Sequence, residues 1–213
     1  MTKQSDYIEQ LIAQGEHEHQ DFKYQISDAR KIARSISAFA NNSGGHLLVG
    51  VRDNGGIAGV SSDEEIYMVD QAATMYCRPE QKLEFTLFKV HGKTVLKVDI
   101  AEAADKPVKA PDDDGHYKAY YRVADENVLA SSLHVKVMSH ATAKEEEPAV
   151  LSFTQHEEQL FDYLRTHGGI TITGYSKLCH ISRLAAEESV VSLCDMGVIQ
   201  LTYHDGQCLI TKP

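Results

Sequence analysis

The chain has 213 residues, of which 42% are hydrophobic and 24% are charged, as is ordinary for a globular protein. No apolar run approaches the roughly 20 residues that a membrane-spanning helix needs, and the N-terminal residues lack the apolar core of a signal peptide. We therefore expect a cytoplasmic protein without membrane association. The formal net charge of −10 argues against nucleic-acid binding by the whole surface, so such binding would need a local concentration of positive charge.

The first part of the chain mixes helical and extended patterns. A first helix ends at Gly15, and Ser27 or Asp28 caps a second helix that runs to about Ala40. Residues 102–116 are polar, contain two prolines and indicate a loop. The remaining patterns predict strands at 46–51, 57–60, 83–90, 94–100 and 118–123, and a helix at 62–76. This mixture predicts an α+β fold with a mixed sheet and flanking helices.

A change of composition separates a second part from the first. Residues 139–152 carry an acidic run, a proline and small residues without an apolar period, which is typical of a linker. We therefore expect one domain at 1–138 and a second at 153–213. The second domain is predicted to contain helices near 153–167, 175–179 and 182–196, followed by strands at 198–203 and 207–211. Three helices followed by a β-hairpin is the order of a winged helix.

Two stretches form a specific motif. Residues 15–23 read GEHEHQDFK, and residues 37–60 read SAFANNSGGHLLVGVRDNGGIAGV. Over about residues 5–135 the chain resembles the AlbA-type domain of the Schlafen family, which has also been described as a divergent ATPase and as an ATP- and DNA-binding domain. That family shows an acidic residue, an acidic-Phe-Lys triplet, Ala-Phe-Ala-Asn-x-x-Gly-Gly and a Gly-Val-x-Asp turn. Asp21 stands where the family more often has Glu.

The resemblance implies a carboxylate site. In nuclease members of the family, acidic residues at positions matching Glu16, Asp21 and Asp53 form the active site, so these three are candidate catalytic residues and ligands for Mg²⁺ or Mn²⁺. Lys23 lies two residues beyond Asp21 on the same face of an extended strand, where it could offset phosphate charge. The alternative is that Glu16 is a surface residue, that Asp21 pairs with Lys23 or Arg30, and that Asp53 is a turn aspartate.

A glycine-containing polar loop connects a helix to a strand. It consists of Asn41, Asn42, Ser43, Gly44 and Gly45, and its backbone N–H groups could bind a phosphate, including that of ATP. An ordinary helix-to-strand connection explains the same residues. No G-x-x-x-x-G-K-[ST] motif occurs, which disfavours a Walker-type ATPase.

Positive charge gathers locally in the first part. Lys23, Arg30, Lys31 and Arg34 could neutralise nucleic-acid phosphates, and Arg122 in a late strand could add a further phosphate contact. The alternative for this run is a solvated helix face.

The second part offers Lys177 and Arg183, but its third helix also carries Glu187 and Glu188. Because phosphate contacts need cations, this module would either dock on DNA or mediate protein contacts and dimerisation.

The leading interpretation is a nucleic-acid-binding protein, specifically a DNA-binding transcriptional regulator, although the sequence does not separate DNA from RNA. A homodimer fits this interpretation, because winged-helix regulators commonly act on two half-sites. One alternative is a metal-dependent nuclease that uses the carboxylate trio. Another is a nucleotide-binding or protein-interaction module.

Overall fold

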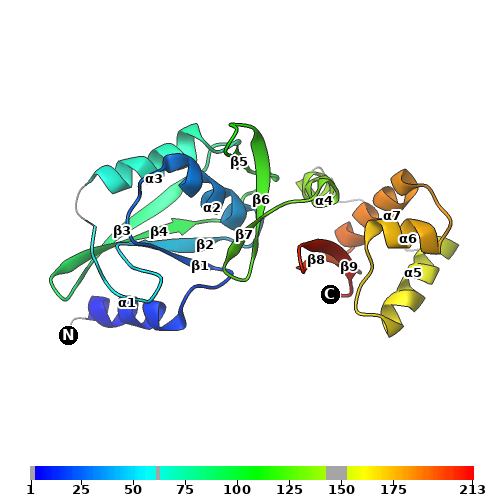
Figure 1. Cartoon of the computed structure of the whole chain (residues 1–213), viewed down its shortest axis with the longest axis horizontal. Coiled ribbons are helices and arrows are strands. Elements are labelled where there is room, and N and C mark those ends of the chain that lie inside the picture. Colours follow the sequence, from blue (N-terminus) through cyan, green and yellow to red (C-terminus); the bar gives the residue numbers. More distant parts are fainter. Residues whose placement is uncertain (1–2, 61–62, 143–152) are drawn as a thin grey trace. The chain divides into compact units, whose positions relative to one another are not determined.

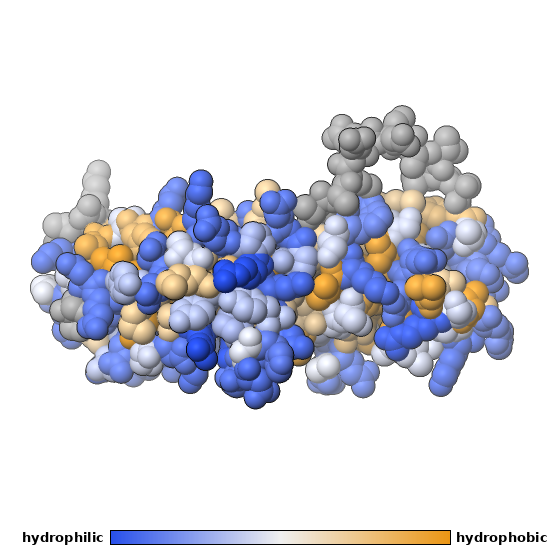
Figure 2. Space-filling model, turned by 90° about the horizontal axis from the view of Figure 1, so that it is seen from above, coloured by the Kyte–Doolittle hydropathy of each residue, from blue (hydrophilic) through white to orange (hydrophobic). Residues whose placement is uncertain are grey.

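The computed structural model describes residues 3–60, 63–142 and 153–213. The chain divides into two compact units, residues 1–130 and 131–213, each with its own core. In the described part of the chain, no helix combines the length and apolarity that crossing a bilayer requires. On the face seen in Figure 2, hydrophobic residues form small separate areas among hydrophilic ones, as is usual for a protein surface.

The first unit contains two sheets. Its elements are α1 (Lys3–Gln14), β1 (Gln20–Lys23), α2 (Ala29–Asn41), β2 (Gly45–Val49), α3 (Glu64–Met75), β3 (Leu83–Val90), β4 (Lys93–Ile100), β5 (Lys109–Pro111), β6 (Tyr117–Val123) and β7 (Glu126–Leu129). The larger sheet has the order β1-β2-β4-β3, with β1 and β2 parallel and the other pairs antiparallel. β5, β6 and β7 form a smaller antiparallel sheet. The predicted α+β fold with a mixed sheet is thus confirmed.

Helices cover both faces of the larger sheet, with α2 and α3 on one face and α1 on the other (Figure 1). Successive side chains of β2 alternate between the two faces, as the pleat of a strand requires. Leu47 and Val49 enter the core beneath α2, whereas Leu48 packs with Ile8 and Phe22 beneath α1. β1 is an edge strand of this sheet, and of the candidate acidic residues it carries Asp21, whereas Glu16 lies shortly before it.

α2 is fixed at both ends by local sequence. Asp28 caps its N-terminus by accepting a hydrogen bond from the backbone N–H of Arg30 at 2.9 Å. At its C-terminal side Gly44 has a positive φ of 75°, and a Cβ there would lie 2.7 Å from the carbonyl oxygen of Ile100. Only glycine avoids both penalties, so Gly44 allows the direct passage from α2 into β2.

The second unit contains four helices and a hairpin among its described residues. They are α4 (Ser132–Thr142), α5 (Gln155–Thr166), α6 (Ile172–Leu178), α7 (Arg183–Asp195), β8 (Gln200–His204) and β9 (Gln207–Thr211). A backbone bridge between Ile170 and Ile210 adds a short extended segment beside β9. Leu160, Tyr175 and Leu193 lie in its core. The predicted three helices and hairpin are present.

The structure differs from the sequence-based expectation in three places. The expected strand at 57–60 is reduced to a single bridge between Val51 and Ile57. The expected loop at 102–116 contains β5, which pairs with β6. The compact units divide after residue 130 rather than 138, because α4 packs against α7 and buries Leu133 in the second core. Residues 139–142 of the expected linker therefore belong to α4, and 143–152 lie outside the described residues.

Candidate functional site

Glu16 and Asp21 form a pair at the edge strand β1. The Glu16 Oε1 atom accepts a hydrogen bond from the backbone N–H of Phe22 at 2.9 Å, which satisfies a donor on this edge. Asp21 is 4% exposed. Burial raises the pKa of Glu16, and a hydrogen bond with the neighbouring Asp21 carboxyl raises it further. The two carboxyl groups are therefore close neighbours, as the motif predicts.

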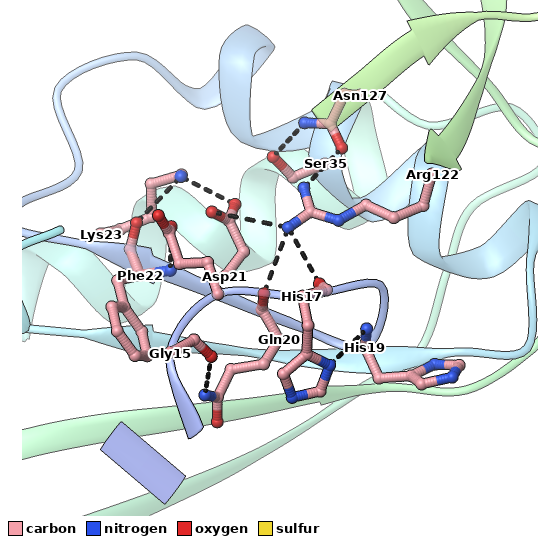
Figure 3. A network of polar contacts seen from close by, with 11 residues as sticks. Gly15, His17, His19, Gln20, Asp21, Phe22, Lys23, Ser35, Arg122 and Asn127 are labelled. Carbon is pink, nitrogen blue, oxygen red and sulfur yellow. Dashed lines mark hydrogen bonds and ion pairs between the residues drawn. The ribbon is translucent and has the colours of Figure 1, made fainter. Parts of the chain in front are cut away.

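Two cations compensate this acidic pair. The Lys23 Nζ atom lies 2.7 Å from Asp21 Oδ2, and the guanidinium of Arg122 lies 3.8 Å from Asp21 Oδ1 (Figure 3). With Glu16, Asp21, Lys23 and Arg122 all ionised, the formal charges of the cluster cancel. A divalent cation needs an excess of negative ligands, so this arrangement leaves little to attract one.

Arg122 is buried, which corrects its expected role as a phosphate contact. It is 1% exposed, and its guanidinium donates to the backbone carbonyls of His17 and Gln20 and to Asn127 Oδ1 at 3.0–3.3 Å (Figure 3). Its ζ-carbon lies 4.8 Å from the centroid of the Phe39 ring. Burial lowers its pKa. Arg122 therefore ties β6 to the turn that enters β1 and has no access to nucleic acid.

Asp53 lies apart from the acidic pair. It is exposed in the turn that the hydrogen bond from the Gly55 N–H to the Arg52 carbonyl closes at 2.7 Å. Within the described ranges, three potential metal ligands come within 4.8 Å of one another only at Asp112, Asp114 and His116. The expected trio of Glu16, Asp21 and Asp53 is thus not assembled, and as arranged it does not fit a resident Mg²⁺ or Mn²⁺.

The asparagines of the polar loop are used inside the fold. Asn41 Nδ2 donates to the carbonyls of Val108 and Tyr120 at 2.8 Å, and Asn41 Oδ1 accepts from the Val108 N–H at 2.7 Å. Asn42 forms the same kind of pair with the N–H and carbonyl of Arg122, at 3.0 and 2.9 Å. The two side-chain amides thus form the hydrogen bonds that a neighbouring strand would otherwise provide to these backbone groups. Neither amide is therefore free to bind a phosphate.

The glycines of the same loop are also required by packing. A Cβ on Gly45 would lie 2.5 Å from the Phe39 ring and 2.7 Å from the His19 carbonyl oxygen. The geometry therefore matches the helix-to-strand connection better than a phosphate-binding loop.

The positive charge of α2 lies on its exposed side. Arg30 and Lys31 are exposed, and the Arg30 ζ-carbon lies 5.8 Å from the centroid of the Tyr76 ring. Arg34 is partly engaged, because its Nε donates to the Pro111 carbonyl at 2.8 Å and its NH2 to Asp113 at 2.6 Å. Burial lowers its pKa, but the hydrogen bond to Asp113 and the negative charges nearby together outweigh burial, so the net pKa is raised.

The structure adds residues that the sequence did not single out. Arg78 lies two residues after Tyr76 in the sequence and is exposed. Its ζ-carbon lies 5.3 Å from the centroid of the Tyr117 ring. No spacing rule could reveal this pair, because it depends on the backbone bridge between Arg78 and Lys109 in a segment predicted to be a loop. We call Arg30, Lys31, Arg34 and Arg78 the basic face.

In the second unit, Lys177 is exposed on α6. Arg183, at the start of α7, donates from Nε to Glu187 Oε1 at 2.8 Å, and Lys136 pairs with the other oxygen of Glu187. The two neighbouring cations lower the pKa of Glu187, Lys136 being the larger cause. Lys177 and Arg183 are the two cations of the second unit that were expected to contact DNA. Of these two, only Lys177 is without an acidic partner in the described structure.

The first unit combines an α+β fold and a mixed sheet with a polar helix-to-strand connection and an acidic pair beside the edge strand β1. These features define the class of domain to which it belongs. The sequence model of the Schlafen, AlbA_2 family matches residues 16–131, more than half of the chain. The chain belongs to this family.

Comparison with solved structures found distant likenesses. The DIP2311 protein from Corynebacterium diphtheriae is 19% identical with a TM-score of 0.45, and the match covers 90% of this chain and 34% of that one. The chain thus spans about a third of the length of that protein. The N-terminal domain of a RecG-related protein from Nitrosomonas europaea is 24% identical with a TM-score of 0.42, covering 73% of this chain and 99% of that domain. A comparison with curated proteins found no match.

Proposed function

We propose that the protein binds nucleic acid in the cytoplasm and that the basic face of the first unit contacts the phosphates. The observation that carries this proposal is the gathering of Arg30, Lys31, Arg34 and Arg78 on a chain whose formal net charge is −10. Lysines and arginines that neutralise phosphates release counterions, which drives binding even when the rest of the protein is acidic. Membership of a family described as DNA-binding supports the same ligand class.

The second unit supports a more specific role as a transcriptional regulator. Its order of α5, a short extended segment at Ile170, α6, α7 and the β8–β9 hairpin is that of a winged helix. In this reading α7 is the helix that enters the major groove, with Lys177 and Arg183 as phosphate contacts. The Arg183–Glu187 pair makes this contact weaker than that of the basic face. Two half-sites would then be bound by a homodimer, which light scattering of the free and DNA-bound protein would test.

The acidic pair does not support a metal-dependent nuclease as a second function. Asp21 is paired with Lys23 and Arg122, and among the described residues Asp53 is not gathered with Glu16 and Asp21 into one set of potential metal ligands. The asparagines of the polar loop likewise give no support to ATP binding there.

The test is fluorescence anisotropy with labelled single-stranded and double-stranded DNA and RNA over a range of salt concentrations. The double variant Arg30→Gln/Lys31→Gln should weaken binding and reduce the magnitude of the slope of log K against log salt by roughly 1.5. A matched double variant, Lys89→Gln/Lys212→Gln, removes the same charge from exposed positions outside the basic face. If both double variants bind equally well, the basic face is not the interface.

A further inference from the structure

Two arginine–tyrosine pairs lie next to each other on the first unit. Arg30 of α2 lies over Tyr76 at the end of α3, and Arg78 lies over Tyr117 of β6, with ζ-carbon to centroid distances of 5.8 and 5.3 Å. Tyr117 is 39% exposed, and both arginines are exposed. Tyr76 is half-buried and packs against the core of the unit, whereas in the Arg78–Tyr117 pair both the guanidinium and the ring are exposed.

The Arg78–Tyr117 pair is held in place by the fold. The Arg78 NH1 atom donates to the carbonyls of Met75 and Cys77, both at 3.1 Å, so the last carbonyls near the α3 terminus orient the guanidinium. The backbone of Arg78 is fixed by two hydrogen bonds to Lys109, at 2.8 and 2.7 Å. Tyr117 is placed opposite Pro111 by the β5–β6 pairing. The pair is thus organised before any ligand arrives.

A third arginine–tyrosine pair has a buried ring and contributes to the packing of the core. Arg34 lies 5.9 Å from the centroid of Tyr120, but Tyr120 is 8% exposed and packs in the core. Tyr117, in contrast, keeps much of its ring in solvent. In the described part of the chain, the Tyr117 hydroxyl has no hydrogen-bond partner, so neither burial nor hydrogen bonding accounts for the position of this ring, whereas Tyr76 packs against the core.

Exposed aromatic rings interleaved with arginines are the means by which proteins bind single strands. Each unpaired base offers a flat face that stacks on an aromatic ring, while the arginines hold the phosphates on either side. In a duplex the base faces are covered by their neighbours, so a stacking site has nothing to bind. We propose that the ligand of the basic face is single-stranded nucleic acid, with an unpaired base stacked on Tyr117. This inference rests on the proposed function and narrows its ligand class.

The experiment measures binding of the full chain to four labelled probes. They are a 12-nucleotide single-stranded DNA, the matching RNA, the DNA duplex, and a single strand of equal length in which the bases are replaced by abasic sites. The wild-type protein should bind the two single strands at least tenfold more tightly than the abasic strand. Tyr117→Leu should weaken single-strand binding by roughly five- to fiftyfold and leave abasic binding unchanged.

Matched variants separate stacking from folding. Tyr117→Phe keeps the ring and should bind like wild type, and Tyr7→Leu changes an exposed tyrosine on α1, on the opposite side of the larger sheet. Equal wild-type binding of the normal and abasic strands would overturn the stacking site, even if Tyr117→Leu failed to fold. Tighter binding of the duplex than of the single strand would overturn it as well. If the wild type binds none of the four probes, the proposed function itself fails.

Discussion

The guanidinium of Arg122 and the carboxylate of Asp21 lie 3.8 Å apart, and their side chains are only 1% and 5% exposed. A buried ion pair costs desolvation energy that its attraction only partly returns, so its strongest effect appears when one partner is removed. Arg122 also donates to the carbonyls of His17 and Gln20, which additionally accept hydrogen bonds from the backbone N–H groups of Gln20 and His17. The pair therefore determines how the acidic edge strand is attached to β6.

The variant Arg122→Met should lower the free energy of unfolding of the first unit by about 1.5–3 kcal/mol, because it removes charged hydrogen bonds from the His17 and Gln20 carbonyls and one of the two cations beside Asp21, of which Lys23 remains. Urea denaturation monitored by hydrogen exchange of β1 measures this loss. Arg165→Met is the control, since Arg165 is 69% exposed and pairs only with Asp162 on the same helix. A loss as small as that of the control would mean that Arg122 does not carry the attachment.

The sequence was sufficient where local rules act and insufficient where distant segments meet. The Asp28 cap, the apolar stripe of α2 and the β3–β4 hairpin follow from spacing and turn residues, and the structure contains them. The burial of Arg122 could not be inferred, because alternation in a strand does not say whether one face or both are covered.

The family motif was also read too literally. It suggested a loop whose backbone binds phosphate, yet the side chain of Asn41 bonds backbone groups 67 and 79 residues away. The pairing of Asp21 with Lys23 was one of the alternatives that the sequence offered, whereas the contact of Asp21 with Arg122 was not. Such contacts depend on the packing of β6 against α2, which no local pattern encodes.

The variant Asn41→Ala should be strongly destabilising, by about 2–4 kcal/mol, because it leaves the buried Val108 N–H without its partner and removes the Asn41 hydrogen bonds to the Val108 and Tyr120 carbonyls, of which the Val108 carbonyl keeps the Ser37 hydroxyl. Ser43→Ala in the same loop is the control, as Ser43 is exposed. Thermal unfolding of both variants, with and without ATP, measures the difference. Stabilisation of the wild type by ATP that is lost in Ser43→Ala, with Asn41→Ala stable, would restore the phosphate-loop interpretation.

Asp113 competes with nucleic acid for the basic face. Its carboxylate lies 2.6 Å from the Arg34 NH2, and Arg34 together with nearby Lys31 lowers its pKa. Asp113→Asn should therefore tighten nucleic-acid binding roughly two- to fivefold at low salt, with a smaller effect at high salt. Anisotropy titrations measure this gain. Asp162→Asn, an equal charge change on α5, should give no gain, and equal affinities of the two variants would contradict the competition.

We expect the protonation of His46 to lower the free energy of unfolding in mild acid. Its pKa is lowered to about 4, mainly by burial and then by the charge of Lys97, with smaller contributions from His17 and His19, whereas Asp99 opposes the shift. Its Nε2 donates to Gln20 Oε1 at 2.8 Å, since the amide nitrogen of Gln20 already donates to two carbonyls. The neutral His46 ring thus links β2 to the edge strand β1 through Gln20.

The unfolded chain binds a proton at His46 near pH 6.5, whereas the folded protein resists until about pH 4, so this stability is complete above pH 6.5 and is lost as the pH falls toward 4. His46→Gln cannot gain this proton and keeps a donor for Gln20. The unfolding free energy of wild type minus that of His46→Gln should therefore decrease steadily between pH 6.5 and 4, which urea denaturation at a series of pH values measures. An NMR titration of the His46 ring in the folded protein should show protonation near pH 4. A midpoint near 6.5, with a constant difference between the two proteins, would mean that the ring is solvated and that the sheet edge around β1 opens readily.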